Sequence, residues 1–399
     1  MPRTGAEKEI MAENNNIVNL NRERFWLLLK KVLRALRIPL IVIAVLGLLL
    51  FGVRMMGEVA ASHLNDAVHD VRMLFSKGAG YPYALEAYQT RHIAMIGSDP
   101  LVLTRESCTV LDGSADTVQH TQLPCADSRA VIRNGRALIY SNTTGSLLML
   151  SRSRQLLSQD VLSGVATSAL SANGSYAVVT AGEKARSTVR VYNRRQVLQF
   201  QWDCAEERIS SVALSDNGKQ LAVLAVGAEN AEIYSRLLLF RTDGNAAQLE
   251  QRYPGTLMLK VIFTSEGRLI AVGDNQTVAL TRKGDKTTIL SYTADSLNDI
   301  ETDDRGDVLL CYDALGGAKA TVVRLDAKGK KTCEITTEFA PSGYAVSGAG
   351  FALADGSRIT VYSAKGAEKR TADAAGEVTQ LLSAGRRIYT VENGVIRRY

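Results

Sequence analysis

The chain has 399 residues, of which 46% are hydrophobic and 22% are charged. These ordinary values exclude disorder throughout the chain, and the length allows one large domain or two medium-sized ones. The formal net charge of +6 could indicate a nucleic-acid partner, but eight Lys/Arg and four Glu fall within residues 1–37. The remaining residues carry 39 basic and 37 acidic side chains, so we expect no nucleic-acid partner.

Residues 1–37 form a basic tail that we expect in the cytoplasm. Its second half, Phe25–Arg37, mixes an aromatic pair and leucines with clustered Lys and Arg. This pattern is typical of an amphipathic segment on an anionic membrane surface, and a solvated basic flank is the alternative.

Residues 38–56 contain the uncharged run Ile38–Val53, which reads IPLIVIAVLGLLLFGV. As a helix this run would be about 24 Å long, and the flanking arginines can snorkel to extend it across a bilayer. The run predicts a transmembrane helix; the alternatives are a buried core helix and a signal peptide cleaved after Val59-Ala60-Ala61. Because the basic tail precedes it, the positive-inside rule predicts a single-pass cell-membrane protein with the rest of the chain extracytoplasmic.

Residues 57–80 predict a short stalk helix followed by a glycine-containing linker. One apolar stripe recurs at helical spacing: Leu64, Val68, Val71 and Phe75. This stripe could contact a partner or pack on the domain that follows.

Residues 81–399 consist of short β-type runs separated by Gly, Asn and Asp turns. One strand pattern recurs at spacings of 37 to 48 residues, ending in Leu111, Leu150, Tyr192, Phe240, Leu280, Leu325, Tyr362 and Tyr399. A second turn recurs between the two preceding strands, as in Ser215-Asp216-Asn217-Gly218. A unit of about 40 residues with four strands is a β-propeller blade.

The eight copies predict an all-β fold, an extracytoplasmic β-propeller of eight blades. The last copy ends at the C-terminus, so its blade needs an outer strand, which residues 84–89 could supply. Seven blades is the alternative if residues 92–123 do not form a blade, and a β-sandwich pair fits the regular period less well.

The chain resembles an uncharacterised family in several features. These are the basic tail, the apolar run, Tyr81-Pro82-Tyr83 and blades such as ISSVALSDNGKQLAVLAV and VIFTSEGRLIAVGDNQTVAL. Its members are single-pass, propeller-bearing membrane proteins of Gram-positive anaerobic bacteria, classed as a domain of unknown function. The resemblance implies the architecture and brings no catalytic residues. The turn Leu325–Lys330 is also similar to the repeats of quinone-cofactor propellers and of the eight-bladed scaffold of outer-membrane protein assembly. Those repeats end in a Trp, and here only Trp202 lies comparably.

Histidines and cysteines show no metal-site pattern. None of the four histidines lies beyond residue 120, so we expect packing or surface roles for His63, His69, His92 and His120. The five cysteines include no C-x-x-C pair, and Cys311 and Cys333 should lie on the second and fourth strands of one blade. We therefore expect buried, reduced thiols at Cys108, Cys125, Cys204, Cys311 and Cys333.

The segment Asp299–Asp307 holds alternating carboxylates, which could bind Ca²⁺. Asp304 stands where a calcium-binding EF-hand loop needs Gly, so a solvated acidic hairpin is the favoured interpretation.

Trp202-Asp203 matches the dipeptide of WD repeats only once, and we interpret it as chance. The basic doublets are expected to be solvated, or to dock on anionic wall polymers: Arg194-Arg195, Arg386-Arg387 and Arg397-Arg398.

The sequence contains no nucleophile elbow, P-loop or dinucleotide-binding fingerprint, so it predicts no catalytic, cofactor or metal site. We expect a non-enzymatic protein-interaction or scaffolding module at the cell surface. Its partners would be the lipid bilayer, through residues 38–56, and a protein at the propeller face. The alternatives are a sensor of wall fragments or peptides, and a quinoprotein-like or hydrolytic enzyme.

Overall fold

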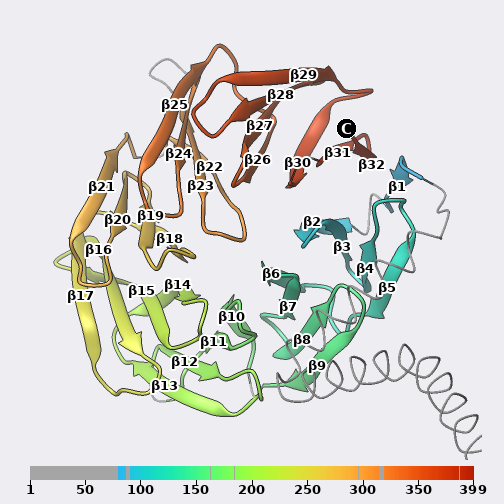
Figure 1. Ribbon diagram of the computed structural model, residues 1–399. Helices are drawn as coiled ribbons and strands as arrows, with labels where there is room; N and C mark the ends of the chain where they lie inside the picture. Colours follow the sequence, from blue (N-terminus) through green and yellow to red (C-terminus); the bar gives the residue numbers. More distant parts are fainter. Residues whose placement is uncertain are drawn as a thin grey trace, which may run out of the picture. The chain divides into compact units, whose positions relative to one another are not determined.

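The structure is a computed structural model that describes residues 80–86, 90–161, 163–183, 185–294, 296–313, 319–385 and 387–399. Within this part of the chain the strands form eight four-stranded antiparallel sheets. The sheets are arranged as blades around a central axis (Figure 1). The predicted eight-bladed, all-β propeller is confirmed, and the seven-bladed alternative is wrong because residues 90–122 form a complete blade.

Each of the first seven blades is one continuous stretch of sequence. The first four blades contain β2 (Thr90–Ile96), β3 (Asp99–Thr104), β4 (Ser107–Leu111), β5 (Thr117–Gln122); β6 (Arg129–Arg133), β7 (Arg136–Tyr140), β8 (Ser146–Ser151), β9 (Gln155–Asp160); β10 (Val165–Leu170), β11 (Tyr176–Thr180), β12 (Ser187–Tyr192), β13 (Leu198–Cys204); and β14 (Arg208–Leu214), β15 (Gln220–Glu229), β16 (Glu232–Arg241), β17 (Ala247–Pro254). The next three contain β18 (Met258–Phe263), β19 (Leu269–Gly273), β20 (Gln276–Leu280), β21 (Lys286–Ser291); β22 (Leu297–Thr302), β23 (Val308–Asp313), β24 (Ala320–Leu325), β25 (Lys331–Thr337); and β26 (Gly343–Ser347), β27 (Gly350–Asp355), β28 (Arg358–Ser363), β29 (Glu368–Asp373).

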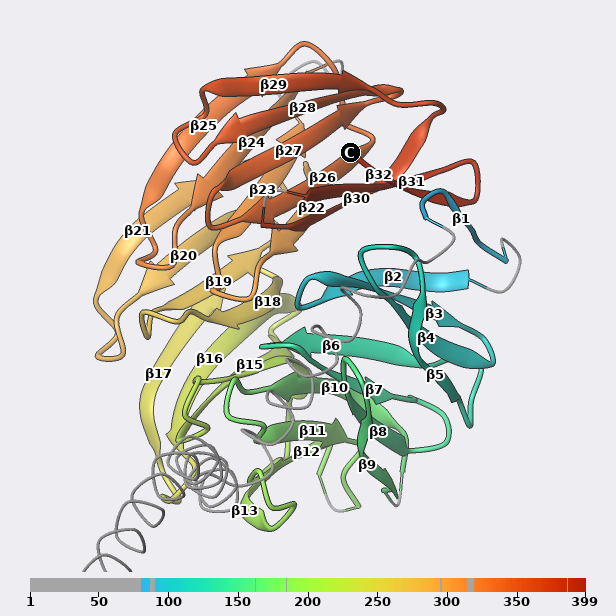
Figure 2. The ribbon, with the colours of Figure 1, turned by 45° about the vertical axis from the view of Figure 1, so that its right-hand side comes forward.

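Blade 8 joins the two ends of the domain. It contains β30 (Val378–Ala384), β31 (Arg387–Glu392), β32 (Val395–Arg398) and, as its outer strand, β1 (Tyr83–Ala84). Figures 1 and 2 show the blue β1 beside the red strands of this blade. The predicted closure is confirmed, but the strand lies at 83–84 instead of 84–89. Its position is set by packing, because Tyr81, Tyr83 and Leu85 contact the apolar cluster between blades 8 and 1.

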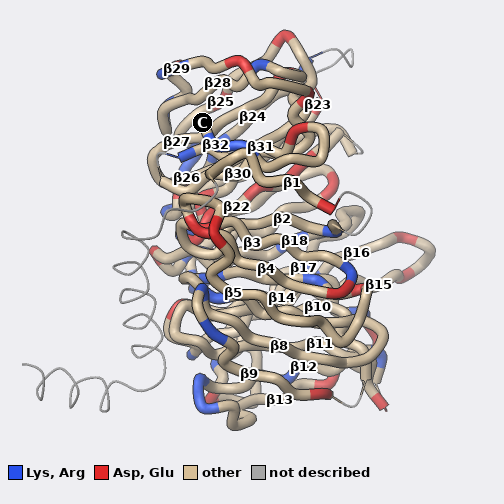
Figure 3. Tube along the Cα trace, turned by 90° about the vertical axis from the view of Figure 1, so that its right-hand side faces the viewer, with Lys and Arg blue, Asp and Glu red and all other residues tan. Residues whose placement is uncertain are grey.

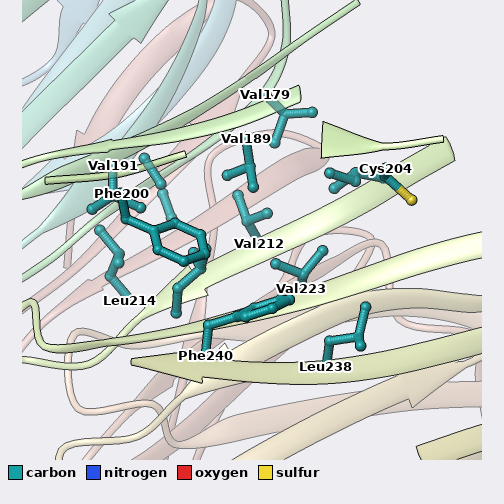
Figure 4. Close-up of a cluster of buried hydrophobic side chains, with 14 of the residues drawn as sticks. Val179, Val189, Val191, Phe200, Cys204, Val212, Leu214, Val223, Leu238 and Phe240 are labelled. Atoms are coloured by element: carbon teal, nitrogen blue, oxygen red, sulfur yellow. The ribbon is translucent and has the colours of Figure 1, made fainter. Parts of the chain in front are cut away.

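A separate apolar cluster fills each of the interfaces between neighbouring blades. Alternation along the strands produces these clusters, because successive side chains point toward opposite neighbours. Figure 4 shows the cluster between blades 3 and 4, where the rings of Phe200 and Phe240 lie 5.4 Å apart. A fully buried side chain of this size stabilises the fold by about 1.5–3 kcal/mol. The ring is therefore held together by contacts between blades as well as by hydrogen bonds within them.

The propeller has two faces, which we name by their loops. The lower face consists of the turns that join the first to the second strand and the third to the fourth strand of each blade; the other loops form the upper face. Lower-face turns contact each other, as where the amide of Thr242 donates to the carbonyl of Lys219 at 3.0 Å. The chain enters the ring at the lower face, where the amide of Gly80 donates to the carbonyl of Ser114 at 2.9 Å.

Among the described residues, no helix has the length and apolar character needed to cross a bilayer. The predicted tail (1–37), transmembrane helix (38–56) and stalk helix (from residue 57) lie outside the described residues. They stay predictions, as does the topology derived from them.

Candidate functional site

A central cavity of about 1050 Å³ is lined by residues of the first strand of every blade. In a propeller these strands surround the axis, so the cavity is the channel of the ring. It is the candidate site because it collects side chains from all eight blades in one place.

A recurrent β-bulge shapes the upper part of this channel. In six blades the pairing of the first and second strands shifts by one residue, at Arg91, Ala166, Ser210, Leu259, Asn298 and Thr379. A bulge takes one residue out of the ladder and bends its strand. The residue that follows reaches the next blade: Ser211 Oγ accepts the amide of Val261 at 3.1 Å, and Gln380 Nε2 donates to the carbonyl of Ile93 at 2.8 Å.

Blade 6 departs from this pattern, because its first strand places a carboxylate where its counterparts are apolar. Glu301 is the third residue after the bulge of β22. In the other bulged strands this position holds Ala94, Ala169, Ala213, Ile262 and Leu382. A carboxylate in an otherwise apolar ring of positions costs stability, which is typical of residues retained for function.

Lys260, Asp299 and Glu301 form a mixed-charge set that we call the channel group. Burial and the neighbouring charge of Asp299 raise the pKa of Glu301 to about 7, while Lys260 acts in the opposite direction. Burial lowers the pKa of Lys260, whose Nζ donates to Thr302 Oγ1 at 3.5 Å. The group thus offers one cation and two carboxyl groups to a ligand in the channel.

Arg133 crosses the lower end of the channel. From blade 2 its guanidinium donates to Asp216 Oδ1 at 2.6 Å on blade 4 and to the carbonyl of Phe263 at 3.3 Å on blade 5. Both hydrogen bonds come from Nη2, and the side chain is only 12% exposed, so this charge-assisted contact is held in place by its surroundings. A ligand therefore has freer access to the channel group from the upper face.

The structure corrects the interpretation of the acidic segment Asp299–Asp307. Asp299 and Glu301 are half-buried in the channel wall, so the expected solvated hairpin is wrong for these residues. Asp303 instead caps the turn, since its Oδ1 accepts the amides of Arg305 and Asp307 at 2.9 Å. In the described part of the chain, no group of three or more His, Cys, Asp or Glu side chains is arranged to hold a metal ion.

The other singled-out residues are scattered. His92 lines the channel, whereas His120 Nδ1 lies 2.9 Å from Thr109 Oγ1; His63 and His69 lie outside the described residues.

All five cysteines are free, and Cys125 alone is not buried. Cys311 and Cys333 lie on the second and fourth strands of blade 6, as predicted. Trp202 packs on Phe240 at 5.1 Å.

Two basic doublets fall within the described residues. Arg194-Arg195 lies in the turn between β12 and β13, and Arg397-Arg398 lies at the end of β32. Arg386, the first residue of the third doublet, lies outside the described residues.

A second feature, on the upper face, is the long hairpin of blade 4. β15 and β16 have 10 residues each and pair as far as Glu229 and Glu232. The flanking strand β17 reaches only Tyr234, so the tip projects beyond its blade, as Figure 3 shows. Sequence reasoning missed it, although the unit that ends in Phe240 is the longest of the repeats.

The hairpin tip is ordered by its own contacts. The Arg252 guanidinium lies 3.8 Å from the centre of the Tyr234 ring and pairs with Glu229. Gly227 faces this ring, and a Cβ there would lie 2.6 Å from it. Next to Tyr234, the side chain of Ile233 is 50% exposed. The tip therefore presents an apolar residue on a preorganised ribbon.

Comparison with known proteins places the chain by fold and family. Solved structures similar to it include Sqt1 from Saccharomyces cerevisiae (TM-score 0.56, 7% identity, covering 82% of this chain and 99% of that one) and BamB from Moraxella catarrhalis (TM-score 0.50, 14% identity, covering 80% and 98%). Apo AztD from Citrobacter koseri also matches (TM-score 0.50, 13% identity, covering 74% and 88%). At these identities the likeness shows the propeller fold alone.

No curated protein is significantly similar to the chain. The family match covers nearly the whole propeller, residues 83–398. The chain therefore belongs to the family of unknown function DUF5711.

Proposed function

We propose that this protein is a membrane-tethered interaction module whose propeller binds a protein partner through its upper face. A β-propeller is typically a protein-interaction module, and loops on a rigid scaffold are where binding residues concentrate. The observation that carries the proposal is the projecting hairpin of blade 4. Its tip is ordered by contacts that serve no blade interface, and it exposes Ile233.

The second part of the proposal is the membrane tether, which is the predicted span at residues 38–56. Its support is the uncharged run 38–53 and the basic tail before it. Protease applied to intact protoplasts should digest the propeller and spare the tail. Protection of the propeller would contradict the topology without bearing on the hairpin.

The hairpin is tested by a matched pair of variants of the full chain. Ile233 and Ile289 are similarly exposed, at 50% and 53%, but Ile289 lies on the outer strand β21. We expect Ile233→Asp to abolish recovery of a stoichiometric partner after crosslinking in the native cells, and Ile289→Asp to leave it unchanged. Equal recovery with both variants would overturn the proposed contact.

A second candidate function, a sensor of peptides or wall fragments, is favoured by the channel group. Lys260 can pair with a ligand carboxylate, while Asp299 and Glu301 can pair with an ammonium group. Calorimetry with trialanine as probe would test this. Binding that Glu301→Gln weakens and the surface control Glu334→Gln does not would support the sensor; absence of binding would count against it.

A further inference from the structure

We propose that the lower face of the propeller docks on an anionic lipid surface, an inference that rests on the proposed tether. The turns of this face expose a set of basic side chains contributed by seven of the eight blades. They are Arg154, Arg194, Arg195, Lys219, Arg241, Arg282, Lys283, Arg305, Lys328, Lys330, Lys365 and Arg387. In Figure 3, Lys and Arg lie along the left edge of the ring, with Asp and Glu among them, opposite the tip of the blade 4 hairpin.

Several acidic residues of the lower face are held inside the turns or in ion pairs. Asp326 Oδ1 accepts the amides of Lys328 and Lys330 at 3.0 and 2.9 Å, which keeps the carboxylate in the turn while both lysine side chains are exposed. Asp216 and Asp99 pair with Arg133 and Arg152. Exposed carboxylates remain on this face at Asp243, Glu266, Asp285, Asp304 and Glu368. They are fewer than the twelve exposed basic side chains, so the net charge of the lower face is positive.

Several of these cations have no acidic partner of their own. Within the described residues, Arg194, Arg195, Lys283, Lys328 and Lys365 form no ion pair, whereas Arg241 pairs with Asp243 at 2.6 Å. The upper face differs, because its exposed carboxylates are at least as numerous as its exposed basic side chains. Its exposed carboxylates include Glu106, Glu183, Glu206, Glu229, Glu232, Asp313, Glu338, Asp355 and Glu377, among the basic residues Arg105, Arg129, Arg186, Arg208, Lys319 and Arg358.

The position of chain entry identifies the surface that this face can reach. The chain joins the ring at Gly80 on the lower face. The predicted membrane span ends at residue 56, so the connecting segment 57–79 would be about 35 Å long as a helix and shorter if it folds back. Attraction between exposed charges falls off within about 8 Å at physiological salt, so the lower face must lie close to the membrane, and a short connection keeps it there.

A lipid surface fits these features better than a soluble polyanion. The basic turns are spread around the ring, so they can contact many headgroups of an extended anionic plane at once, each adding to a sum of weak attractions. Docking would hold the lower face against the bilayer and leave the upper face, with the blade 4 hairpin, accessible to a protein.

The test uses the propeller, residues 80–399, which closes on itself and contains its own interblade clusters. Its binding to phosphatidylglycerol-containing vesicles and to pure phosphatidylcholine vesicles is measured by sedimentation. A lower-face variant combines four reversals: Arg194→Glu, Arg195→Glu, Lys283→Glu and Lys328→Glu. A matched control makes the same charge change on the upper face: Arg105→Glu, Arg186→Glu, Arg208→Glu and Arg358→Glu. Thermal melting checks that both variants fold.

We expect wild-type propeller to bind the anionic vesicles and to dissociate as salt rises toward about 0.5 M. The lower-face variant should bind about tenfold more weakly or worse, and the upper-face control within about threefold of wild type. Equal weakening by both variants, or wild-type binding to a polyphosphate wall polymer but not to vesicles, would overturn the proposal.

The tether is tested separately, by fractionating cells that express the full chain with and without residues 38–56. Membrane association that is lost on this deletion, together with no vesicle binding by the propeller, would overturn lower-face docking and leave the proposed function standing. Soluble full chain would contradict the tether itself.

Discussion

The interfaces between blades and the wall of the channel are built by the same first strands, yet their chemistry is opposite. Between blades the side chains are apolar and almost fully buried, as in the cluster around Phe240. In the channel wall at blade 6, Glu301 and Lys260 are held beside each other with perturbed pKa values. The difference teaches that apolar packing between the blades stabilises the fold, whereas the channel wall can hold partly buried charged residues that destabilise it.

The largest effect is expected between the blades. Phe240→Ala should lower the free energy of unfolding by about 3–5 kcal/mol, because it leaves a cavity beside Phe200 and Trp202. Urea unfolding of the propeller measures it. The exposed control Ile289→Ala should stay within about 0.5 kcal/mol of wild type. Similar losses in both variants would contradict the assignment of stability to the interfaces.

In the channel, a substitution is expected to raise the free energy of unfolding instead of lowering it. The pKa of Glu301 is raised from 4.5 to about 7 in the folded protein, so its ionisation destabilises the fold increasingly as pH rises through this window. Glu301→Gln should therefore stabilise the propeller by about 1–2 kcal/mol at pH 8 and by nothing near pH 4.

Thermal melting at the two pH values measures this gain. The matched control is Glu334→Gln, which removes an exposed carboxylate paired with Lys331 and should give no gain at either pH. A loss of stability in Glu301→Gln at pH 8 would contradict the claim that the ionised carboxylate of Glu301 destabilises the fold.

The smallest effect concerns a polar group buried between blades 4 and 5. The buried hydroxyl of Tyr253 has no hydrogen-bond partner in the described structure, and burial raises its pKa to about 12. Tyr253→Phe should leave stability unchanged or raise it by up to about 1 kcal/mol.

The control for that substitution is Tyr292, whose hydroxyl donates to the carbonyl of Gly273 at 2.7 Å. Tyr292→Phe should cost about 1 kcal/mol in urea unfolding. The reverse order of the two variants would show that polar groups, and not apolar packing, stabilise these interfaces.

The sequence predicted the interfaces well and the channel poorly, for a physical reason. Bulky residues such as Phe240 and Leu280 end repeated strands, so their recurrence revealed both the number of blades and their packing. The channel depends on bulges that shift six of the eight first strands by one residue, and a shift of one residue turns every following side chain to the other face. Asp299 and Glu301 therefore read as a solvated hairpin until their register was known.

The contact between the blade 4 hairpin and a protein partner can be tested directly. A photo-crosslinking phenylalanine derivative placed at residue 233 of the full chain, in the native cells, should give a discrete adduct with one partner protein. The same derivative at residue 289, which is equally exposed but lies on β21, should give none. No adduct at 233, or the same adducts at both positions, would contradict the assignment of the upper face to protein binding.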